Sequence, residues 1–292
     1  MTGRSHDVIV KQTGAGTRLG RSATASPSAP NIAALIAHVE AYGYVVIPNA
    51  FTAAEADEAH DEVLRLASSP TTAGPAGASG GRNAFEGHRT RRVYALLNKS
   101  PAFYKFPLHP ALLALNDHFL DPGFLLNAFH SVYIQPGEAP QPLHHDDGQG
   151  VMIALNRFTA TNSATVVIPA SHTWGPDTDL AQARRENTTP VVMSKGSAVF
   201  FLGTLWHGGR ENTSAHERRA LTVQYCQPWM RPPENQVLAV EWEKLSGMPR
   251  RLVDLLGYEV GAPFVGYAHG LHPWKVVQRR LREREGGGNQ KL

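Results

Sequence analysis

The sequence predicts a mainly β protein with flanking helices, whose core is an antiparallel sandwich or barrel. From Phe124 onward, short apolar runs alternate with turn residues, as they do in antiparallel strands. Upstream, apolar residues recur at helical spacing, and 42% hydrophobic against 18% charged residues allows a sizeable core. The predicted strands are Phe124–Ile134, Val151–Leu155, Thr165–Ile168, Val191–Val192, Ala198–Leu202 and Ala220–Tyr225.

The chain is predicted to begin with a flexible arm, followed by a helix and a strand. Residues 1–30 are rich in Gly, Ser, Thr and Pro, which bury too little apolar surface to order themselves. Residues 31–42 then place apolar side chains at helical spacing, and Gly43 is a stop signal. Tyr44–Pro48 is a short apolar run, which indicates a buried strand.

A second helix is predicted to begin after Thr52. Glu55 follows three residues later and completes a capping box, so the helix should extend to about Ala67. The next stretch, Ser68 to Arg82, is rich in Gly, Ala, Pro and Ser. A loop of this length inside a compact domain is often functional, and we expect a lid or an irregular loop here.

The elements group into one expected domain. We place it at residues 31–285, with the β core at about 124–236 and a C-terminal extension at 237–285. The extension is partly helical and basic from Leu245 to Arg284, and residues 286–292 are expected to be a flexible tail.

The composition disfavours nucleic acids and membranes as partners. Lys plus Arg number 28 and Asp plus Glu 25, without a block of like charges. No stretch approaches the roughly 18 apolar residues of a membrane span, and the first residues lack a secretory hydrophobic run. The single cysteine, Cys226, excludes an intramolecular disulfide and a multi-cysteine metal site. We therefore expect a cytoplasmic protein that acts on a small molecule, and we leave a homodimer open.

A candidate metal site consists of the motif His144-His145-Asp146 and the distant His207. Residues two apart in a strand project to the same side, so His144 and Asp146 can reach one metal ion together. The pair His145/Asp147 satisfies the same rule, and spacing alone leaves both pairs open. Two histidines and one carboxylate on one face of a metal ion leave the opposite positions free, an arrangement typical of non-haem Fe(II) oxygenases that bind a co-substrate and O2.

Arg218 follows His207 by eleven residues and is a candidate anion clamp. Iron(II) held by two neutral imidazoles and one aspartate keeps a charge of about +1, which suits a dicarboxylate that chelates through a 2-oxo acid end. Its distal carboxylate would then need a partner, and arginine offers a planar, permanently charged fork. The neighbouring Arg219 should face the other way. Other histidines among the chain's 14, such as His109, His130, His172 and His216, are expected to be structural or surface residues.

Taken together, these words resemble the phytanoyl-CoA dioxygenase family of Fe(II)- and 2-oxoglutarate-dependent oxygenases. The resemblance covers roughly Ile32 to Pro273 and is strongest from Gln135 to Asn235. It implies a double-stranded β-helix, a cupin-like jelly-roll core. The words that carry it are Gln141-Pro-Leu-His144-His-Asp146, Thr165-Val-Val-Ile-Pro169-Ala-Ser171-His172, Trp206-His207-Gly208-Gly209 and Asn212-Thr-Ser214 leading to Arg218-Arg219-Ala220.

The resemblance assigns roles residue by residue. It implies His144, Asp146 and His207 as the iron ligands, and Arg218 as the clamp on the distal carboxylate of 2-oxoglutarate. Gln141 and Thr165 stand where members often hydrogen-bond the co-substrate. The chain departs from the family at Ala170 and Ser163, where glycine is usual, and we expect any change there to leave the ligands untouched.

The implied reaction consumes O2 and 2-oxoglutarate, forms succinate and CO2, and oxidises a C–H bond of a small organic molecule. Hydroxylation is the expected outcome, with desaturation, epoxidation or rearrangement open. Halogenation is disfavoured, because related halogenases replace the residue at Asp146 with a small one. We expect a free metabolite, a specialised one being favoured, in preference to a CoA thioester. Residues between Arg82 and Asn98, together with the Ser68–Gly81 loop, are candidates to line its pocket: Asn83, Phe85, Arg92, Tyr94 and Asn98.

Two alternatives from other classes stay open. One is a jelly-roll binding protein that has lost catalysis, against which stands the presence of all four key residues. The other is a metal-dependent cupin-like enzyme that does not use 2-oxoglutarate. Arg218 discriminates against the latter, since such an enzyme has no dicarboxylate to hold.

Overall fold

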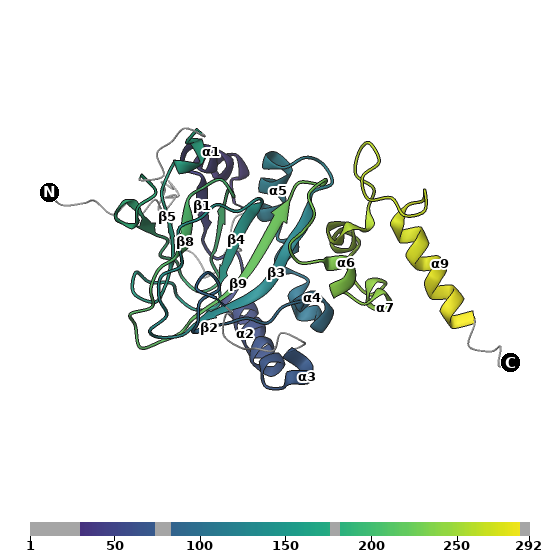
Figure 1. Ribbon diagram of the computed structural model, residues 1–292, viewed down its shortest axis with the longest axis horizontal. Coiled ribbons are helices and arrows are strands. Elements are labelled where there is room, and N and C mark those ends of the chain that lie inside the picture. Colours follow the sequence, from purple (N-terminus) through teal and green to yellow (C-terminus); the bar gives the residue numbers. More distant parts are fainter. Residues whose placement is uncertain (1–29, 74–82, 176–181, 287–292) are drawn as a thin grey trace, which may run out of the picture.

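The computed structural model describes residues 30–73, 83–175 and 182–286, which form two antiparallel sheets with helices on one side (Figure 1). The larger sheet has six strands in the order β1-β7-β4-β9-β3-β2, and the smaller has three in the order β6-β5-β8. The strands are β1 Tyr44–Ile47, β2 Thr90–Arg91, β3 Leu125–Ile134, β4 Gln149–Ala154, β5 Thr165–Val167, β6 Thr189–Pro190, β7 Ala198–Phe201, β8 His207–Gly209 and β9 Arg218–Cys226. Within the described ranges, no helix is long and apolar enough to cross a membrane.

The two N-terminal helices begin and end where their capping residues predict. The side chain of Asn31 accepts from the backbone of α1, and Gly43 ends that helix in the left-handed conformation. Thr52 and Glu55 form the predicted capping box of α2. The helices are α1 Ile32–Tyr42, α2 Ala53–Ala67, α3 Pro70–Ala73, α4 Leu96–Lys99, α5 Pro110–Phe119, α6 Gln236–Ala239, α7 Trp242–Leu245, α8 Arg250–Val253 and α9 Pro273–Gly286.

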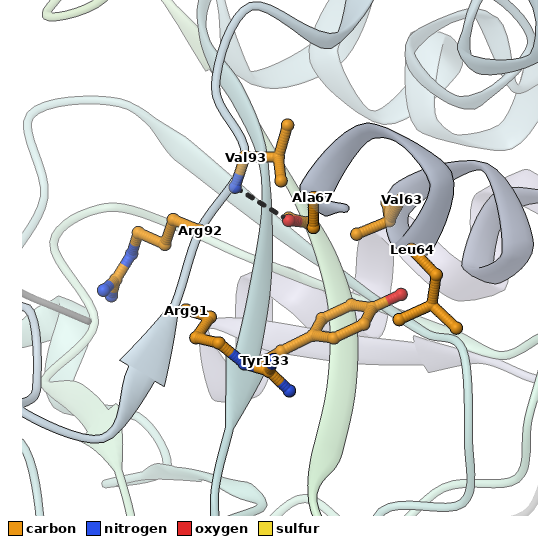
Figure 2. A pocket seen from close by; sticks show the side chains of 8 residues that line it. Val63, Leu64, Ala67, Arg91, Arg92, Val93 and Tyr133 are labelled. Carbon is orange, nitrogen blue, oxygen red and sulfur yellow. Dashed lines mark hydrogen bonds between the residues drawn. The ribbon is translucent and has the colours of Figure 1, made fainter. Parts of the chain in front are cut away.

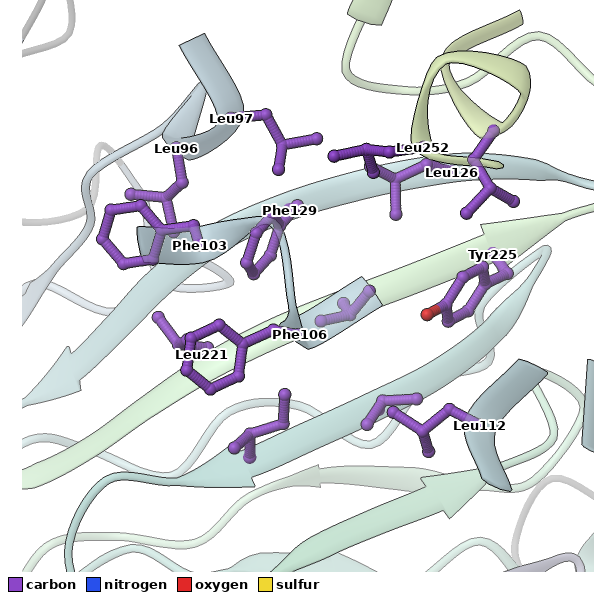
Figure 3. Packing of buried hydrophobic residues seen from close by; sticks show 14 of the residues in the cluster. Leu96, Leu97, Phe103, Phe106, Leu112, Leu126, Phe129, Leu221, Tyr225 and Leu252 are labelled. Atoms are coloured by element: carbon purple, nitrogen blue, oxygen red, sulfur yellow. The ribbon is translucent and has the colours of Figure 1, made fainter. Parts of the chain in front are cut away.

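The large sheet buries its two faces against different partners. On β9, Leu221, Val223 and Tyr225 pack beneath the helices, whereas Ala220 belongs to the apolar cluster on the opposite, inner face. Figure 3 shows side chains of α4, α5 and α8 meeting those of β3 and β9 on the helix side. Full burial of a Leu or Phe stabilises a fold by about 1.5–3 kcal/mol. Packing of the helices on this face therefore stabilises the large sheet, whose opposite face is the inner one. The faces of β9 thus alternate with period two, in agreement with the prediction that Arg219 faces away from Arg218.

Several other predictions need correction or fall outside the described residues. The strand predicted at Val191–Val192 was wrong by two residues, because pairing occurs at Thr189–Pro190. Val191 is apolar because it is buried, and its N–H donates to the Thr165 carbonyl just past the ladder, 2.8 Å away. The predicted Ser68–Arg82 loop contains the short helix α3, and residues 74–82 lie outside the described ranges, as do most of the arm and the tail.

Two turns near the smaller sheet hold non-glycine residues in a backbone conformation that favours glycine. Ala170 has φ +63° and Ser163 has φ +67°. The Ser163 hydroxyl donates to the Arg210 carbonyl, which supplies a local partner for its turn. Ala170 has no side-chain polar group to compensate, so its turn carries the strain of a left-handed alanine.

Candidate metal centre

Three side chains converge between the two sheets. His144 and Asp146 lie on the extended segment that leads into β4, and His207 opens β8. The backbones of His144 and His207 pair, with N–H to carbonyl distances of 2.9 and 3.1 Å. One ligand atom from each of the three side chains lies within 4.8 Å of the others. Asp146 oxygens are 3.9 Å from His144 Nε2 and 3.5 Å from His207 Nε2.

The orientation of both imidazoles is set by backbone carbonyls. His144 Nδ1 lies 2.9 Å from the Pro142 carbonyl, and His207 Nδ1 lies 2.8 Å from the Leu205 carbonyl. A carbonyl only accepts, so each Nδ1 must carry the proton and each Nε2 keeps a free lone pair. Both lone pairs therefore face the Asp146 side, as in histidines whose second nitrogen is fixed for metal binding.

The protonation states also suit a cation. Burial by itself raises the pKa of Asp146, but the nearby His207 and His144 imidazoles and the hydrogen bond from Gln224 outweigh this, so the pKa lies below its ordinary value. Gln224 Nε2 donates to Asp146 Oδ2 at 3.0 Å and holds the carboxylate in place. Burial, followed by the proximity of His207, lowers the pKa of His144. At neutral pH Asp146 is ionised and His144 neutral, the forms that bind a metal ion.

The structure separates the two pairs that spacing left open. His145 is exposed and its ring lies 4.2 Å from the Trp206 ring, outside the three-residue group. Asp147 is exposed as well. Among the described residues, only His144, Asp146 and His207 form a group of three or more potential ligands.

Asp146 is held by a close approach of two backbone segments. Its N–H donates to the Gly203 carbonyl at 2.9 Å. A Cβ atom on Gly203 would lie 2.3 Å from both the Asp146 and the Gly148 carbonyl oxygens, a distance that real Cβ atoms do not show. Glycine at position 203 is therefore a geometric requirement of the candidate metal centre.

Arg218 lies on the inner face of β9, and no described residue offers it a carboxylate partner. Its side chain is buried, the residue being only 3% exposed, and Nε and Nη1 have no hydrogen-bond partner among the described residues. Its guanidinium stands 4.8 Å over the ring of Phe158. Burial, followed by the charge of Arg92, lowers the pKa of Arg218. Arg219 faces the other side and binds Glu217 at 2.6 Å.

Arg92 adds a second positive charge to this interior. Figure 2 shows Arg91 and Arg92 leaving the chain on opposite sides, and the exposed Arg91 binds the half-buried Glu217 at 3.2 Å. Arg92 is half-buried and donates to the Glu86 carbonyl. The pocket drawn in Figure 2 holds about 20 Å³, room for roughly one water molecule. It lies between α2 and the helix-side face of β3, so it is separate from the metal centre.

Gln141 and Thr165 are both close to β8, but they differ in the partners of their side chains. The Gln141 amide already has two protein partners, because Oε1 accepts from Gly209 N and Nε2 donates to the Phe85 carbonyl, each at 3.1 Å. Thr165 is buried on β5 opposite Gly209. It shares its side of the sheet with Val167, which pairs with His207, so Thr165 faces the interior.

The candidate substrate residues divide into two groups. The Phe85 ring lies 4.7 Å from the His144 ring, and the Tyr94 ring lies 4.9 Å from that of His130. Asn83 instead caps a turn by accepting from two backbone N–H groups. Asn98 packs on the C-terminal extension, because both ends of its amide bind Glu241 at 3.0 and 3.2 Å.

Sequence reasoning missed two interior residues. His130, expected to be structural or on the surface, lies on the inner face of β3 opposite Thr222 of β9. Its alternation with Val132 and Ile134 was the available signal. The contact of Gln224 with Asp146 joins residues far apart in the chain, so only its inward direction was predictable.

The residues present fit a metal ion and a dianionic co-substrate. Two imidazole nitrogens and one carboxylate that leave other positions free are the donor set of non-haem Fe(II) oxygenases. A buried guanidinium with two nitrogens that find no partner among the described residues fits the free carboxylate of an acid bound at that metal.

Comparisons with known proteins show which family this chain resembles. The phytanoyl-CoA dioxygenase family model matches residues 39–220. Dioxygenase trt7 of Aspergillus terreus is 31% identical over 216 residues, covering 67% of this chain and 73% of that protein. Dioxygenase swnH1 of Metarhizium robertsii is 33% identical over 177 residues, covering 54% of this chain and 56% of that protein. The chain thus spans about half the length of the swnH1 relative.

A solved structure supports the fold. HygX from Streptomyces hygroscopicus, crystallised with nickel and 2-oxoglutarate bound, superposes with a TM-score of 0.56 at 16% identity, covering 68% of this chain and 88% of that one. This likeness shows the jelly-roll fold, which confirms the predicted fold class. The family match extends over more than half of the chain. The chain belongs to the phytanoyl-CoA dioxygenase family.

Proposed function

We propose that this protein is an Fe(II)- and 2-oxoglutarate-dependent dioxygenase that hydroxylates a C–H bond of a small organic molecule. The observation that carries the proposal is the pairing of the His144, Asp146 and His207 group with the buried, unpartnered Arg218. Bound iron and 2-oxoglutarate would supply the oxidising chemistry, in which one oxygen atom of O2 enters succinate and the other the product, with loss of CO2.

In this proposal the protein's residues hold and orient the reactants. His144, Asp146 and His207 hold the iron, and Gln224 keeps the Asp146 carboxylate turned toward the two imidazoles. Arg218 binds the distal carboxylate of 2-oxoglutarate through Nε and Nη1, which have no hydrogen-bond partner in the described part of the chain. Thr165 is in place to add a hydroxyl contact. Gln141 can contribute only if its amide exchanges a present partner.

Charge balance supports a dianion in this interior. Fe(II) with the Asp146 carboxylate leaves about one positive charge, and Arg218 adds another, so together they neutralise a dicarboxylate. Arg92 lies close enough to influence the pKa of Arg218. A buried guanidinium such as that of Arg218 is costly without an anion beside it, which favours co-substrate binding.

Anaerobic titration of the Fe(II)-loaded protein with 2-oxoglutarate tests the proposal. A bidentate 2-oxo acid on Fe(II) gives a weak visible charge-transfer band, and we expect it to saturate at one equivalent. Absence of the band in the loaded wild-type protein would refute the proposed function. His144→Ala should abolish the band.

His145→Ala is the matched control for the choice of ligands. His145 is adjacent in sequence but faces Trp206, so its loss should leave both the band and the iron stoichiometry unchanged. The opposite pattern, with the band kept in His144→Ala and lost in His145→Ala, would overturn the assignment of the ligand pair.

A further inference from the structure

The inner face of β3 carries two polar side chains with buried atoms that the protein leaves without partners. Asn127 Oδ1 and His130 Nδ1 have no hydrogen bond among the described residues. An unpaired buried polar atom costs about 1–3 kcal/mol, so two on one strand near a candidate metal centre call for a ligand. Neither atom has a part in the proposed binding of iron or 2-oxoglutarate.

A β-bulge turns Asn127 toward the segment Asp146–Gly148, which leads into β4. The register between β3 and β9 shifts between Leu126 and Ala128, which leaves Asn127 as the extra residue. Bulges near active sites re-aim side chains in this way. A Cβ atom placed on Gly148 would lie 3.3 Å from Asn127 Nδ2, so the Asn127 amide lies beside Gly148. Gly148 follows Asp146 by two residues in the sequence.

His130 lies in the middle of the inner face, between the two ends of the proposed co-substrate site. It pairs with Thr222, which in turn pairs with Met152 on β4. Thr222 is two residues from Gln224, the partner of Asp146, and four from Arg218. Burial lowers the pKa of His130 to about 3, and the residue as a whole keeps part of its surface accessible. It therefore presents a neutral imidazole to whatever enters.

Tyr94 completes the group and is fixed beside His130. The two rings lie 4.9 Å apart. One carboxylate, that of Glu234, accepts from the N–H of Ala95 at 2.8 Å and from the N–H of Phe129 at 2.9 Å. These are the residues next to Tyr94 and His130. A single side chain thus sets the spacing of the pair, which indicates a preorganised surface.

The surroundings of this group favour a neutral guest. The charges of iron, Asp146, 2-oxoglutarate and Arg218 cancel in the proposed complex, and Arg92 is faced by the acidic Glu86 and Glu138. No positive charge is left over for a second anion. The flanking inner-face residues Val132 and Met152 are apolar and buried. Amide, imidazole and phenol groups bind hydroxyls and carbonyls by hydrogen bonds.

We propose that Asn127, His130 and Tyr94 form the recognition site for the prime substrate, and that this site takes a neutral hydroxyl or carbonyl group on an otherwise apolar molecule. The inference rests on the proposed function, since it assigns the substrate class of the same interior. It makes His130 a specificity-determining residue and disfavours carboxylates and CoA thioesters as substrates.

Three rigid probes of one shape test the substrate class: 1-adamantanol, 1-methoxyadamantane and 1-adamantanecarboxylate. Their binding to the full-length protein loaded with Zn(II) and 2-oxoglutarate, which cannot turn over, is measured by ligand-observed NMR. We expect the alcohol to bind more tightly than the carboxylate. His130→Leu should lower the affinity for 1-adamantanol by about fivefold, the effect of one hydrogen bond. The affinity for the alcohol should then equal the affinity for 1-methoxyadamantane. His130→Gln, which keeps a neutral hydrogen-bonding group, should restore part of the preference.

Two controls separate recognition from folding. His109 also has an unpartnered buried Nδ1, but it packs on Phe51 on the helix side, so His109→Leu should leave all three affinities unchanged. In ¹⁵N-histidine-labelled protein, 1-adamantanol should shift the His130 Nδ1 signal, which a purely structural role would not produce.

The outcomes distinguish this inference from the proposed function. Wild-type protein that binds 2-oxoglutarate but binds the alcohol no better than the carboxylate, or not at all, overturns the recognition site alone. So does an unchanged preference in His130→Leu. Failure to bind 2-oxoglutarate, with the alcohol preference and the His130 shift intact, removes the proposed function and leaves the neutral recognition site standing.

Discussion

Replacing Arg218 with methionine should affect ligand affinity and the stability of the ligand-free protein in opposite directions. Methionine has a similar length and fills the space beside Phe158, but it removes the buried charge. Truncating one partner of a buried charge pair costs about 2–5 kcal/mol, and a loss of about 3 kcal/mol raises the Kd for 2-oxoglutarate roughly 150-fold. Arg218→Lys keeps the charge but loses the planar fork, so an intermediate loss is expected.

Without a co-substrate the sign reverses. Arg218 is then a buried cation whose Nε and Nη1 are unpartnered, and the ring of Phe158 returns only about 1–2 kcal/mol of cation–π attraction. Apolar replacement of such a charge is often stabilising by 1–4 kcal/mol. After that offset, a net gain of about 1 kcal/mol raises the Tm of the ligand-free protein by roughly 2–4 °C.

Calorimetric titration with 2-oxoglutarate and thermal unfolding of the metal-free protein measure the two effects. Arg219→Met is the matched control, because Arg219 is the adjacent arginine, faces outward and binds Glu217. It should leave the Kd unchanged. An unaltered Kd in Arg218→Met, or a lowered Tm of its ligand-free form, would refute the reasoning that this arginine is held ready for an anion.

Three further predictions concern stability and the candidate metal centre. Ala170→Gly should relieve a left-handed alanine at φ +63° and raise the free energy of unfolding in urea by about 0.5–1 kcal/mol, whereas a decrease would show that the turn is unstrained. Gly203→Ala should push away the Asp146 carbonyl and weaken metal binding in a competition assay. Gly175 has open space around it, so Gly175→Ala should leave metal affinity unchanged. Equal metal affinities of the two variants would contradict the predicted clash. Since folding holds the pKa of His130 near 3, against about 6.5 when unfolded, stability should be full above pH 6.5 and fall as the pH drops toward 3. At pH 5 the loss is at most about 2 kcal/mol, and His130→Gln should abolish that part of the urea-measured pH dependence; an identical acid profile would rule out a buried neutral histidine.

Local patterns in the chain made much of the fold predictable. The capping box at Thr52 and Glu55 and the stop at Gly43 depend on neighbours within a few residues, and both appear in the structure. Alternation along β9 gave the correct faces because side chains in a strand have period two. The strand at Val191–Val192 was misplaced, because a buried apolar residue next to a ladder has the same pattern as one within it.

The candidate site was predictable in its residue types but not in its contacts. The motifs around His144 and His207 were informative because they bring together residue types that bind a metal ion. The partners of each side chain were not: Gln141 proved to be occupied by Gly209 and Phe85, and Asn98 by Glu241. Hydrogen bonds between distant segments follow from packing, which one sequence does not display.

By itself, the sequence determined which functional groups are present: two histidines, an aspartate and an arginine set among strands. It also carried the family resemblance that the comparisons confirmed. Only the tertiary structure decided which neighbours act together. It paired the backbone of His144 with that of His207, left Nε and Nη1 of Arg218 without a hydrogen bond among the described residues, and brought His130 to the same interior through the register of β3 with β9. The physical reason is that residue type sets what a side chain can bind, whereas strand register sets what it can reach.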